Sequence, residues 1–150
     1  MRAFRLVLSL SMLANWPVSA LAQRPQALAD SDLVVAGVPF PSDTVTVRAR
    51  LGEPSARNAT SWVYGGLVVY FDAQGKLRQV QLTSARFATA RGLRVGDSAD
   101  HVTRSYGASC YQGTYTYCRT VGADFDARGI RVSVRRGRVA RIIVGAVFET

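Results

Sequence analysis

Histidine and cysteine are almost missing from this chain of 150 residues. His101 is the only histidine, and Cys110 and Cys118 are the only cysteines. A serine or cysteine nucleophile needs a base beside it, and the sequence around His101 offers no such partner. A glycine-rich phosphate-binding loop is missing as well. These absences argue against an enzyme, and we expect no catalytic residues and no cofactor.

Residues that could hold a metal ion are equally scarce. Asp97, Asp100 and His101 form the one nominal group, but solvent exposure and helix capping explain them more simply. Asp124 and Asp126 alternate along a possible strand and therefore point to opposite faces, which disfavours a catalytic carboxylate pair. We predict no metal site.

Long hydrophobic runs are missing beyond the first residues. The apolar stretch 6–13 follows Arg2 and Arg5 and precedes the small residues at 20–22. This order is typical of a cleaved export signal, and the stretch is too short to span a bilayer. We expect residues 1–22 to be removed after Ala22, with no lipidated cysteine, no membrane helix, and a periplasmic or secreted location.

The two cysteines enclose a short, tyrosine-rich loop. In an oxidising compartment, Cys110 and Cys118 are expected to form a disulfide. Closing so short a loop stabilises the fold by about 2.5 kcal/mol. Three tyrosines lie between them and make this loop the first candidate for a contact surface: Tyr111, Tyr115 and Tyr117.

Acidic residues are outnumbered by basic ones, 10 to 19, which gives a formal net charge of +9. All of the basic residues except Lys76 are arginines. Codon bias in a GC-rich genome explains such a composition, and so does a preference for anionic partners. Acidic protein surfaces, phospholipid headgroups and lipopolysaccharide are the partners to consider. Nucleic acid is not expected for an exported protein.

Two segments that start 55 residues apart, 37–52 and 92–107, share one pattern. Each starts with a glycine and an apolar residue, continues with capping residues, and places two apolar residues four apart before a closing glycine. Capping side chains followed by such spacing predict a short helix that ends at the glycine. A repeated small unit must bury its apolar face against its twin or a partner.

Strands are predicted after each helix. Alternating and β-branched residues predict strands at 61–64, 67–71 and 76–82 in the first half, and at 130–134 and 138–144 in the second. In both final hairpins one apolar residue is out of phase with those that follow, Leu77 and Val139. The shared slip predicts a bulge at the same place in both hairpins. A second alignment, of 71–75 with 125–129, competes with this hairpin alignment.

We therefore predict an α+β fold of two tandem units, each a helix followed by an antiparallel β-meander, packed as one domain. The first unit covers 37–91, and the second covers 92–150 with the disulfide loop. Residues 23–36 are expected to be a flexible lead-in or a short strand that docks on the core. A helix on one face of the sheet leaves the other face for function.

The first unit resembles a known family. Residues 47–54, which include Leu-Gly-Glu-Pro, the Trp-Val-Tyr of 62–64, and the hairpin 67–77 resemble the SmpA/OmlA (BamE-like) envelope family. The tandem arrangement is similar to the β-lactamase-inhibitor-protein fold, which implies two such units side by side with a concave sheet. The second unit lacks the Trp-x-Tyr sequence and the proline, and no functional residue is transferred from either family.

Aromatic and arginine side chains are the remaining candidates for binding. Trp62 and Tyr70 lie on neighbouring strands, where they fit either an interface or ordinary core filling. Arginines concentrate on the last hairpin, where they either solvate the sheet or hold an acidic ligand: Arg131, Arg135, Arg136, Arg138 and Arg141. The sequence thus indicates an exported protein that acts by protein–protein contact, such as an inhibitor or an envelope-assembly accessory. The alternative is a binder of anionic lipid or lipopolysaccharide through an arginine-rich sheet face.

Overall fold

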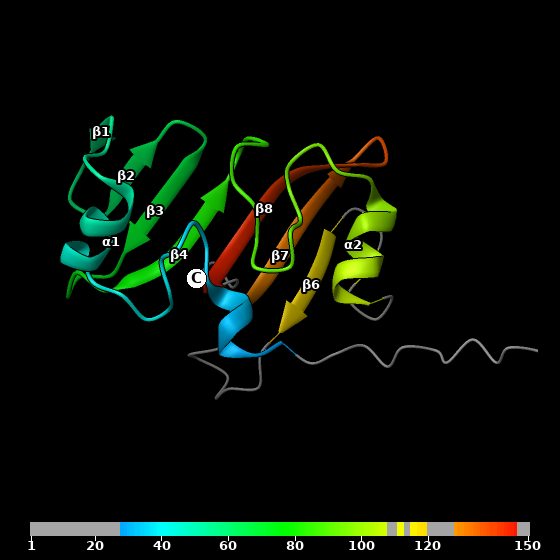
Figure 1. The fold of residues 1–150 in the computed structure, drawn as a ribbon, viewed down its shortest axis with the longest axis horizontal. Helices are drawn as coiled ribbons and strands as arrows, with labels where there is room; N and C mark the ends of the chain where they lie inside the picture. Colours follow the sequence, from blue (N-terminus) through cyan, green and yellow to red (C-terminus); the bar gives the residue numbers. More distant parts are fainter. Residues whose placement is uncertain (1–27, 108–110, 113–114, 120–127, 147–150) are drawn as a thin grey trace, which may run out of the picture.

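The protein has a mixed α+β fold built on one antiparallel sheet. The computed structural model describes residues 28–107, 111–112, 115–119 and 128–146. Eight strands follow the order β1-β2-β3-β4-β8-β7-β6-β5. Their bounds are β1 Ala56–Arg57, β2 Ser61–Tyr64, β3 Leu67–Phe71, β4 Leu77–Leu82, β5 Tyr111–Gln112, β6 Tyr115–Arg119, β7 Arg128–Arg135 and β8 Arg138–Ala146. Figure 1 shows the two meanders side by side, with β4 and β8 at the centre.

Two helices form where the sequence predicts them. Helix α1 spans Thr44–Leu51, and the Asp43 carboxylate accepts a hydrogen bond from the Thr46 amide at 2.8 Å. Helix α2 spans Ala99–Tyr106, and the Ser98 hydroxyl accepts one from the His101 amide. These caps satisfy backbone donors that the first helical turn leaves free. The β-branched residues of α1 are poor helix formers, so its cap and its packing hold it in place.

Both helices bury residues in the same core, which lies on one face of the sheet (Figure 1). Val47 of α1, together with Val102 and Tyr106 of α2, is at most 1% exposed. Burying an aliphatic side chain of this size contributes about 1.5–3 kcal/mol each. The strands supply every second residue to the core, among them Val69, Val80, Ile130, Ile142 and Val144.

The hairpins β3–β4 and β7–β8 contain the predicted bulges. In the first, Phe71 pairs with Leu77 while Tyr70 pairs with Gln79, so one residue of β4 is left over. In the second, Val134 pairs with Val139 while Ser133 pairs with Arg141. The surplus residue therefore follows Leu77 in one hairpin and Val139 in the other.

The segment before the first helix is not a flexible lead-in within the part that the structure describes. Residues Asp30–Leu33 form a 3-10 helix, η1, and Leu33 and Val35 are 1% exposed. Val35 also forms isolated β-bridges with Val38 and Thr89. Burial of these apolar side chains docks Leu33 and Val35 on the core. The expected export signal, 1–22, lies outside the described residues.

Gly145 permits the close contact at the junction of the two meanders. It pairs with Gln79 of β4 and has a φ of +110°, which L side chains rarely adopt. A Cβ atom placed on Gly145 would lie 2.5 Å from the Arg78 carbonyl oxygen and 2.6 Å from Cε1 of Phe40. The backbone of β4 and the buried Phe40 ring therefore occupy the space that a side chain would need.

Replacing Gly145 with alanine should cost about 3 kcal/mol or more of unfolding free energy, because backbone strain and overlap with a carbonyl add together. Gly137→Ala is the matched control, since Gly137 also has a positive φ but nothing lies within 4 Å of its added Cβ. The control should lose about 1 kcal/mol from backbone strain alone. Urea unfolding of both variants measures the difference. Equal losses would show that the junction is not tightly packed.

Candidate functional site on the helix-free face

The sheet face opposite the helices is made by residues that alternate with the core positions. We call it the helix-free face. Across the central strands, Tyr70 pairs with Gln79, Gln81 with Ile143, Arg131 with Ile143, and Ser133 with Arg141. Paired residues in antiparallel strands share a face. The helix-free face therefore consists of Ser61, Val63, Val68, Tyr70, Gln79, Gln81, Arg131, Ser133, Arg141 and Ile143.

Arg141 lies near the centre of this face beside a buried aliphatic side chain. Ile143 is 2% exposed but does not belong to the core cluster, which agrees with its place on the other side of the sheet. The Arg141 side chain is partly exposed, and its buried Nε–H has no hydrogen-bond acceptor within the described part of the chain. A buried donor left without an acceptor costs about 1–3 kcal/mol. An acceptor brought by a partner would recover that free energy.

Charge is segregated between the strands and the rest of the chain. Among the described residues, no strand contains Asp or Glu. These strands contain the arginines Arg57, Arg78, Arg119, Arg128, Arg131, Arg135, Arg138 and Arg141. The acidic residues that the structure describes all lie in helices, caps and turns: Asp30, Asp32, Asp43, Glu53, Asp72, Asp97 and Asp100. The sheet therefore presents positive charge without nearby compensation on its strands.

The structure separates the aromatic candidates. Trp62 is 8% exposed and faces the core, where its ring meets Phe71 edge-on at 4.9 Å and Arg48 lies over it at 5.3 Å. This burial agrees with the core-filling alternative for Trp62, and a contact role for this residue stays a prediction. Tyr70 is partly exposed on the helix-free face, as a contact residue must be.

The structure also separates the predicted arginine cluster. Arg131 and Arg141 lie on the helix-free face, whereas Arg135, Arg136 and Arg138 lie at the exposed β7–β8 hairpin tip. Arg138 is tied to the helix side, because its Nη1 donates to the Gly96 carbonyl oxygen at 3.0 Å. The bulge after Val139 shifts the strand register. Residues at the hairpin tip are therefore out of phase with Arg141 at the sheet centre.

The disulfide loop falls largely outside the described residues. Cys110 lies outside them, and Cys118, Tyr111, Tyr115 and Tyr117 are placed by strand pairing alone. Tyr115 pairs with Ser133 and Tyr117 with Arg131, so both occupy register positions next to residues of the helix-free face. The disulfide and the tyrosine contact surface stay predictions.

His101 is held by one carboxylate. Its Nδ1 lies 2.9 Å from Asp97 Oδ2, and Asp97 also accepts a hydrogen bond from the Arg94 amide. In the described segments, Ser98 meets His101 at the helix cap, where the His101 backbone amide donates to the Ser98 hydroxyl. Over the same residues, no three potential ligands gather into a metal site.

A second polar cluster is buried between η1 and α2. Arg91 donates through Nε and Nη2 to the two oxygens of Asp32 at 2.7 and 2.6 Å, and through Nη1 to the Ser105 carbonyl oxygen. Its guanidinium lies 5.1 Å from the centre of the Tyr106 ring. The Tyr106 hydroxyl lies 2.6 Å from Thr89 Oγ1, and burial raises the pKa of Tyr106 to about 12. Every group has a partner, so this cluster ties η1 to α2 and is not a reactive site.

Sequence analysis missed the glutamines of the helix-free face and the central place of Arg141. The alternation of β4 points to Gln79 and Gln81, but strand order is needed to bring them beside Ile143.

None of the helices in the described residues is long and apolar enough to cross a membrane. Comparison of the chain with protein-family models, with curated proteins and with solved structures returned no match.

The Asp32–Arg91 pair makes stability depend on pH. Hydrogen bonds from Arg91, opposed by burial, lower the pKa of Asp32 below its ordinary value. A lowered carboxyl pKa gives stability that is present above the unfolded-state pKa of about 3.9 and is lost as the pH falls through the folded-state value. We expect Asp32→Asn to lower the unfolding free energy by about 2 kcal/mol near neutral pH.

Denaturant unfolding near pH 7 and near pH 2.5 measures this effect. The difference in unfolding free energy between wild type and Asp32→Asn should be smaller at the lower pH. Asp30→Asn is the control, because Asp30 lies in the same turn and is exposed. A gap that is equally wide at both pH values would contradict the role of the Asp32 charge.

Proposed function

We propose that this protein is an exported, non-catalytic binding protein whose helix-free face holds an acidic surface of another protein. The observation that carries the proposal is the buried Nε–H of Arg141, which has no acceptor among the described residues, on a sheet whose strands contain no acidic side chain. The proposal includes two roles for such binding. One is inhibition of an envelope or extracellular enzyme, and the other is assistance in envelope assembly.

The chemistry of the face favours a protein partner. Tyr70 and Arg141 are of the residue types that most often anchor protein interfaces. Gln79 and Gln81 are partly exposed on one side of Ile143. The Gln79 amide nitrogen already donates to the Ala146 carbonyl oxygen at 2.7 Å, and Gln81 offers an amide donor and acceptor to a partner. A carboxylate that reaches Arg141 could accept two parallel hydrogen bonds from the guanidinium, which Lys could not supply in that geometry.

We further propose that the two halves are tandem copies of one unit. Equivalent contacts support this proposal: the Leu77 amide donates to the Ser42 carbonyl oxygen at 2.7 Å, and the Val139 amide donates to that of Asp97 at 2.8 Å. In both halves the helix-capping residue also forms an isolated β-bridge with the residue that precedes Leu77 or Val139. Asp43 bridges to Lys76, and Ser98 bridges to Arg138. The hairpin alignment is favoured over that of 71–75 with 125–129, because Gly75 lies in a turn whereas Gly129 lies in β7.

The predicted disulfide loop is included in the proposed surface. Strand β6 is hydrogen-bonded to β7, so the positions of Tyr115 and Tyr117 continue the helix-free face beyond Arg131. Tyr115→Ala should weaken partner capture if the loop is part of the interface. Unchanged capture by this variant would limit the interface to the central strands.

Site-specific photocrosslinking tests the main proposal. A photoreactive residue in place of Gln81 should capture a partner with an acidic surface, whereas one in place of Val45, which is 75% exposed on α1, should not. Arg141→Glu should reduce capture by about tenfold, because it puts a like charge opposite the partner's carboxylates. Arg104→Glu on α2 makes the same charge change away from the face and should have little effect.

Equal capture from positions 81 and 45 would contradict the proposed face. Equal loss in Arg141→Glu and Arg104→Glu would mean that net charge, and not this surface, governs binding. Unfolding curves of both variants ensure that any loss reflects binding and not a failure to fold.

A second candidate function is binding to anionic lipid or lipopolysaccharide, and the hairpin tip favours it. Arg135, Arg136 and Arg138 are exposed together, and no acidic residue lies on β7 or β8. Basic side chains near an anionic membrane contribute about 1 kcal/mol each, and salt screens the attraction.

Cosedimentation with phosphatidylglycerol vesicles tests this alternative. Replacing Arg135 and Arg136 together with glutamine should lower the vesicle affinity by about tenfold, since two contributions of about 1 kcal/mol are lost. The control replaces Arg57 and Arg104, which are exposed on β1 and α2. Vesicle binding that does not weaken with added salt would argue against a membrane contact at the hairpin tip. An equal loss of affinity in the control variant would argue against it as well.

A further inference from the structure

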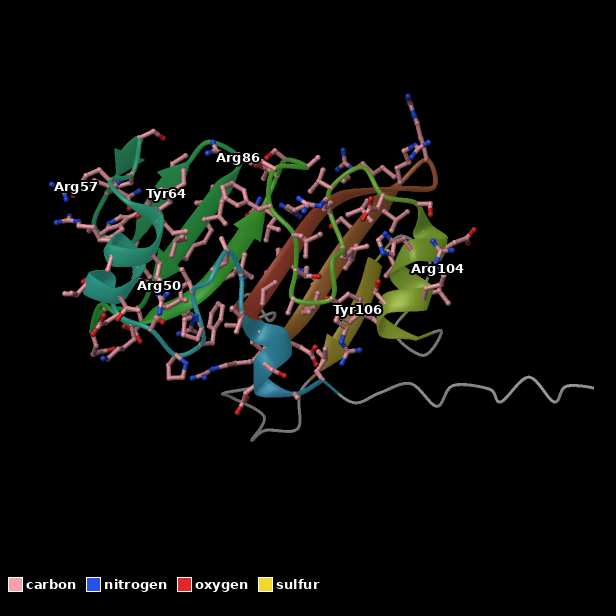
Figure 2. All side chains as sticks on the ribbon, viewed as in Figure 1. Arg50, Arg57, Tyr64, Arg86, Arg104 and Tyr106 are labelled. Atoms are coloured by element: carbon pink, nitrogen blue, oxygen red, sulfur yellow. The ribbon has the colours of Figure 1, made fainter. Side chains whose placement is uncertain are left out.

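A cavity of about 430 Å³ lies on the helix-covered side of the sheet, apart from the helix-free face. It is bordered by the end of α1, the end of β2 and the loop that follows β4. Figure 2 labels three of its residues, Arg50 on α1, Tyr64 on β2 and Arg86 on the loop. This volume falls within the range of pockets that hold small ligands.

Arg86 is exposed, and its side chain extends along the rim of the cavity. Its guanidinium lies 5.5 Å from the centre of the Phe87 ring, and its Nη1 lies 3.6 Å from the place where Gly65 would carry a Cβ. Arg94 holds the backbone below it, since Nη1 of Arg94 donates to the carbonyl oxygens of Ala85 and Arg86 at 2.9 and 3.2 Å. These hydrogen bonds hold the loop backbone from which the Arg86 guanidinium reaches the cavity.

The charges around the cavity are not balanced by the protein. Arg50 and Arg86 have no acidic partner among the described residues. Glu53 also borders the cavity, but its Oε1 accepts from Nε of Arg48 at 3.2 Å. The last turn of α1 contains two cations, Arg48 and Arg50, and of these Arg50 borders the cavity. Arg86 lies on a separate loop, and its charge is not paired with a carboxylate of the described residues.

The walls of the cavity are suited to an organic ligand. Tyr64 is 8% exposed and donates its hydroxyl hydrogen to the Gly52 carbonyl oxygen at 3.3 Å, and burial raises the pKa of this phenol. The ring therefore stays neutral and adds no charge that would repel an anion. Leu51 and Phe87 are partly buried and add apolar surface to the lining of the cavity.

We propose that this cavity binds a small organic anion, a phosphate or carboxylate attached to an apolar or aromatic group. Arg86 binds the anionic group, Arg50 adds a second positive charge, and the apolar part lies against Leu51, Tyr64 and Phe87. The proposal does not depend on the helix-free face, because none of these residues belongs to it.

Nuclear magnetic resonance titration of the full chain tests the proposal with phenyl phosphate and benzoate. Either probe should bind saturably with a dissociation constant of about 1 mM, as expected for a fragment of this size. The largest shifts should appear at the amides of Gly65 and Phe87. Benzyl alcohol, which lacks the charge, and inorganic phosphate, which lacks the ring, should each bind more weakly.

Single substitutions give the decisive comparison. Arg86→Gln should weaken binding by about tenfold or more, since a charge-assisted hydrogen-bond pair is lost. Arg50→Gln should weaken it less. Arg57→Gln is the matched control, because Arg57 is exposed on nearby β1 but does not border the cavity (Figure 2).

Three results would overturn the proposal: no saturable shift at Gly65 and Phe87, equal weakening by Arg57→Gln and Arg86→Gln, or equal affinity for benzyl alcohol and the anions. Shifts confined to Gln81 and Arg141 would place the anion on the helix-free face instead. Crosslinking from position 81 is measured separately, so either proposal can fail while the other holds.

Discussion

The ladder between β4 and β8 makes one sheet out of two short meanders. Val80 pairs with Val144 and Leu82 pairs with Ile142, so buried residues from both halves meet at the centre of the core. A small unit with one short helix has too little apolar surface to fold well by itself. The close approach at Gly145 lets Phe40 pack against this junction, and the sheet becomes continuous from β1 to β5.

A continuous sheet has two faces, and in this protein they differ in chemistry. The helices and η1 cover one face, and the Asp32–Arg91 pair ties η1 to the end of α2. The acidic residues of the described segments lie on these covering elements and in turns; Asp43 caps α1, Glu53 pairs with Arg48, and Asp97 pairs with His101. The strands keep the arginines. The helix-free face is therefore positively charged because the acidic residues lie in helices, caps and turns and not in the strands.

Local elements could be predicted because their causes are local. Asp43 and Ser98 cap the helices from adjacent positions, and glycines end them. The same period-2 pattern predicts β2, β3 and β4, and the phase slips at Leu77 and Val139 predict the bulges. The place of Trp62 could not be predicted, because an aromatic residue on a strand suits the core and an interface equally well until the helix that covers it is known.

By itself, the sequence determined the short helices, the strands, the excess of arginine and the scarcity of catalytic side chains, since these follow from composition and near-neighbour pattern. The tertiary structure alone decided which arginines lie together. Arg131 and Arg141 share a face through the pairing of β7 with β8, while Arg50 and Arg86 share a cavity although 36 residues of chain separate them. Charges that are distant in sequence become one binding surface only when backbone hydrogen bonds and core packing fix their separation, and local sequence pattern does not contain that information.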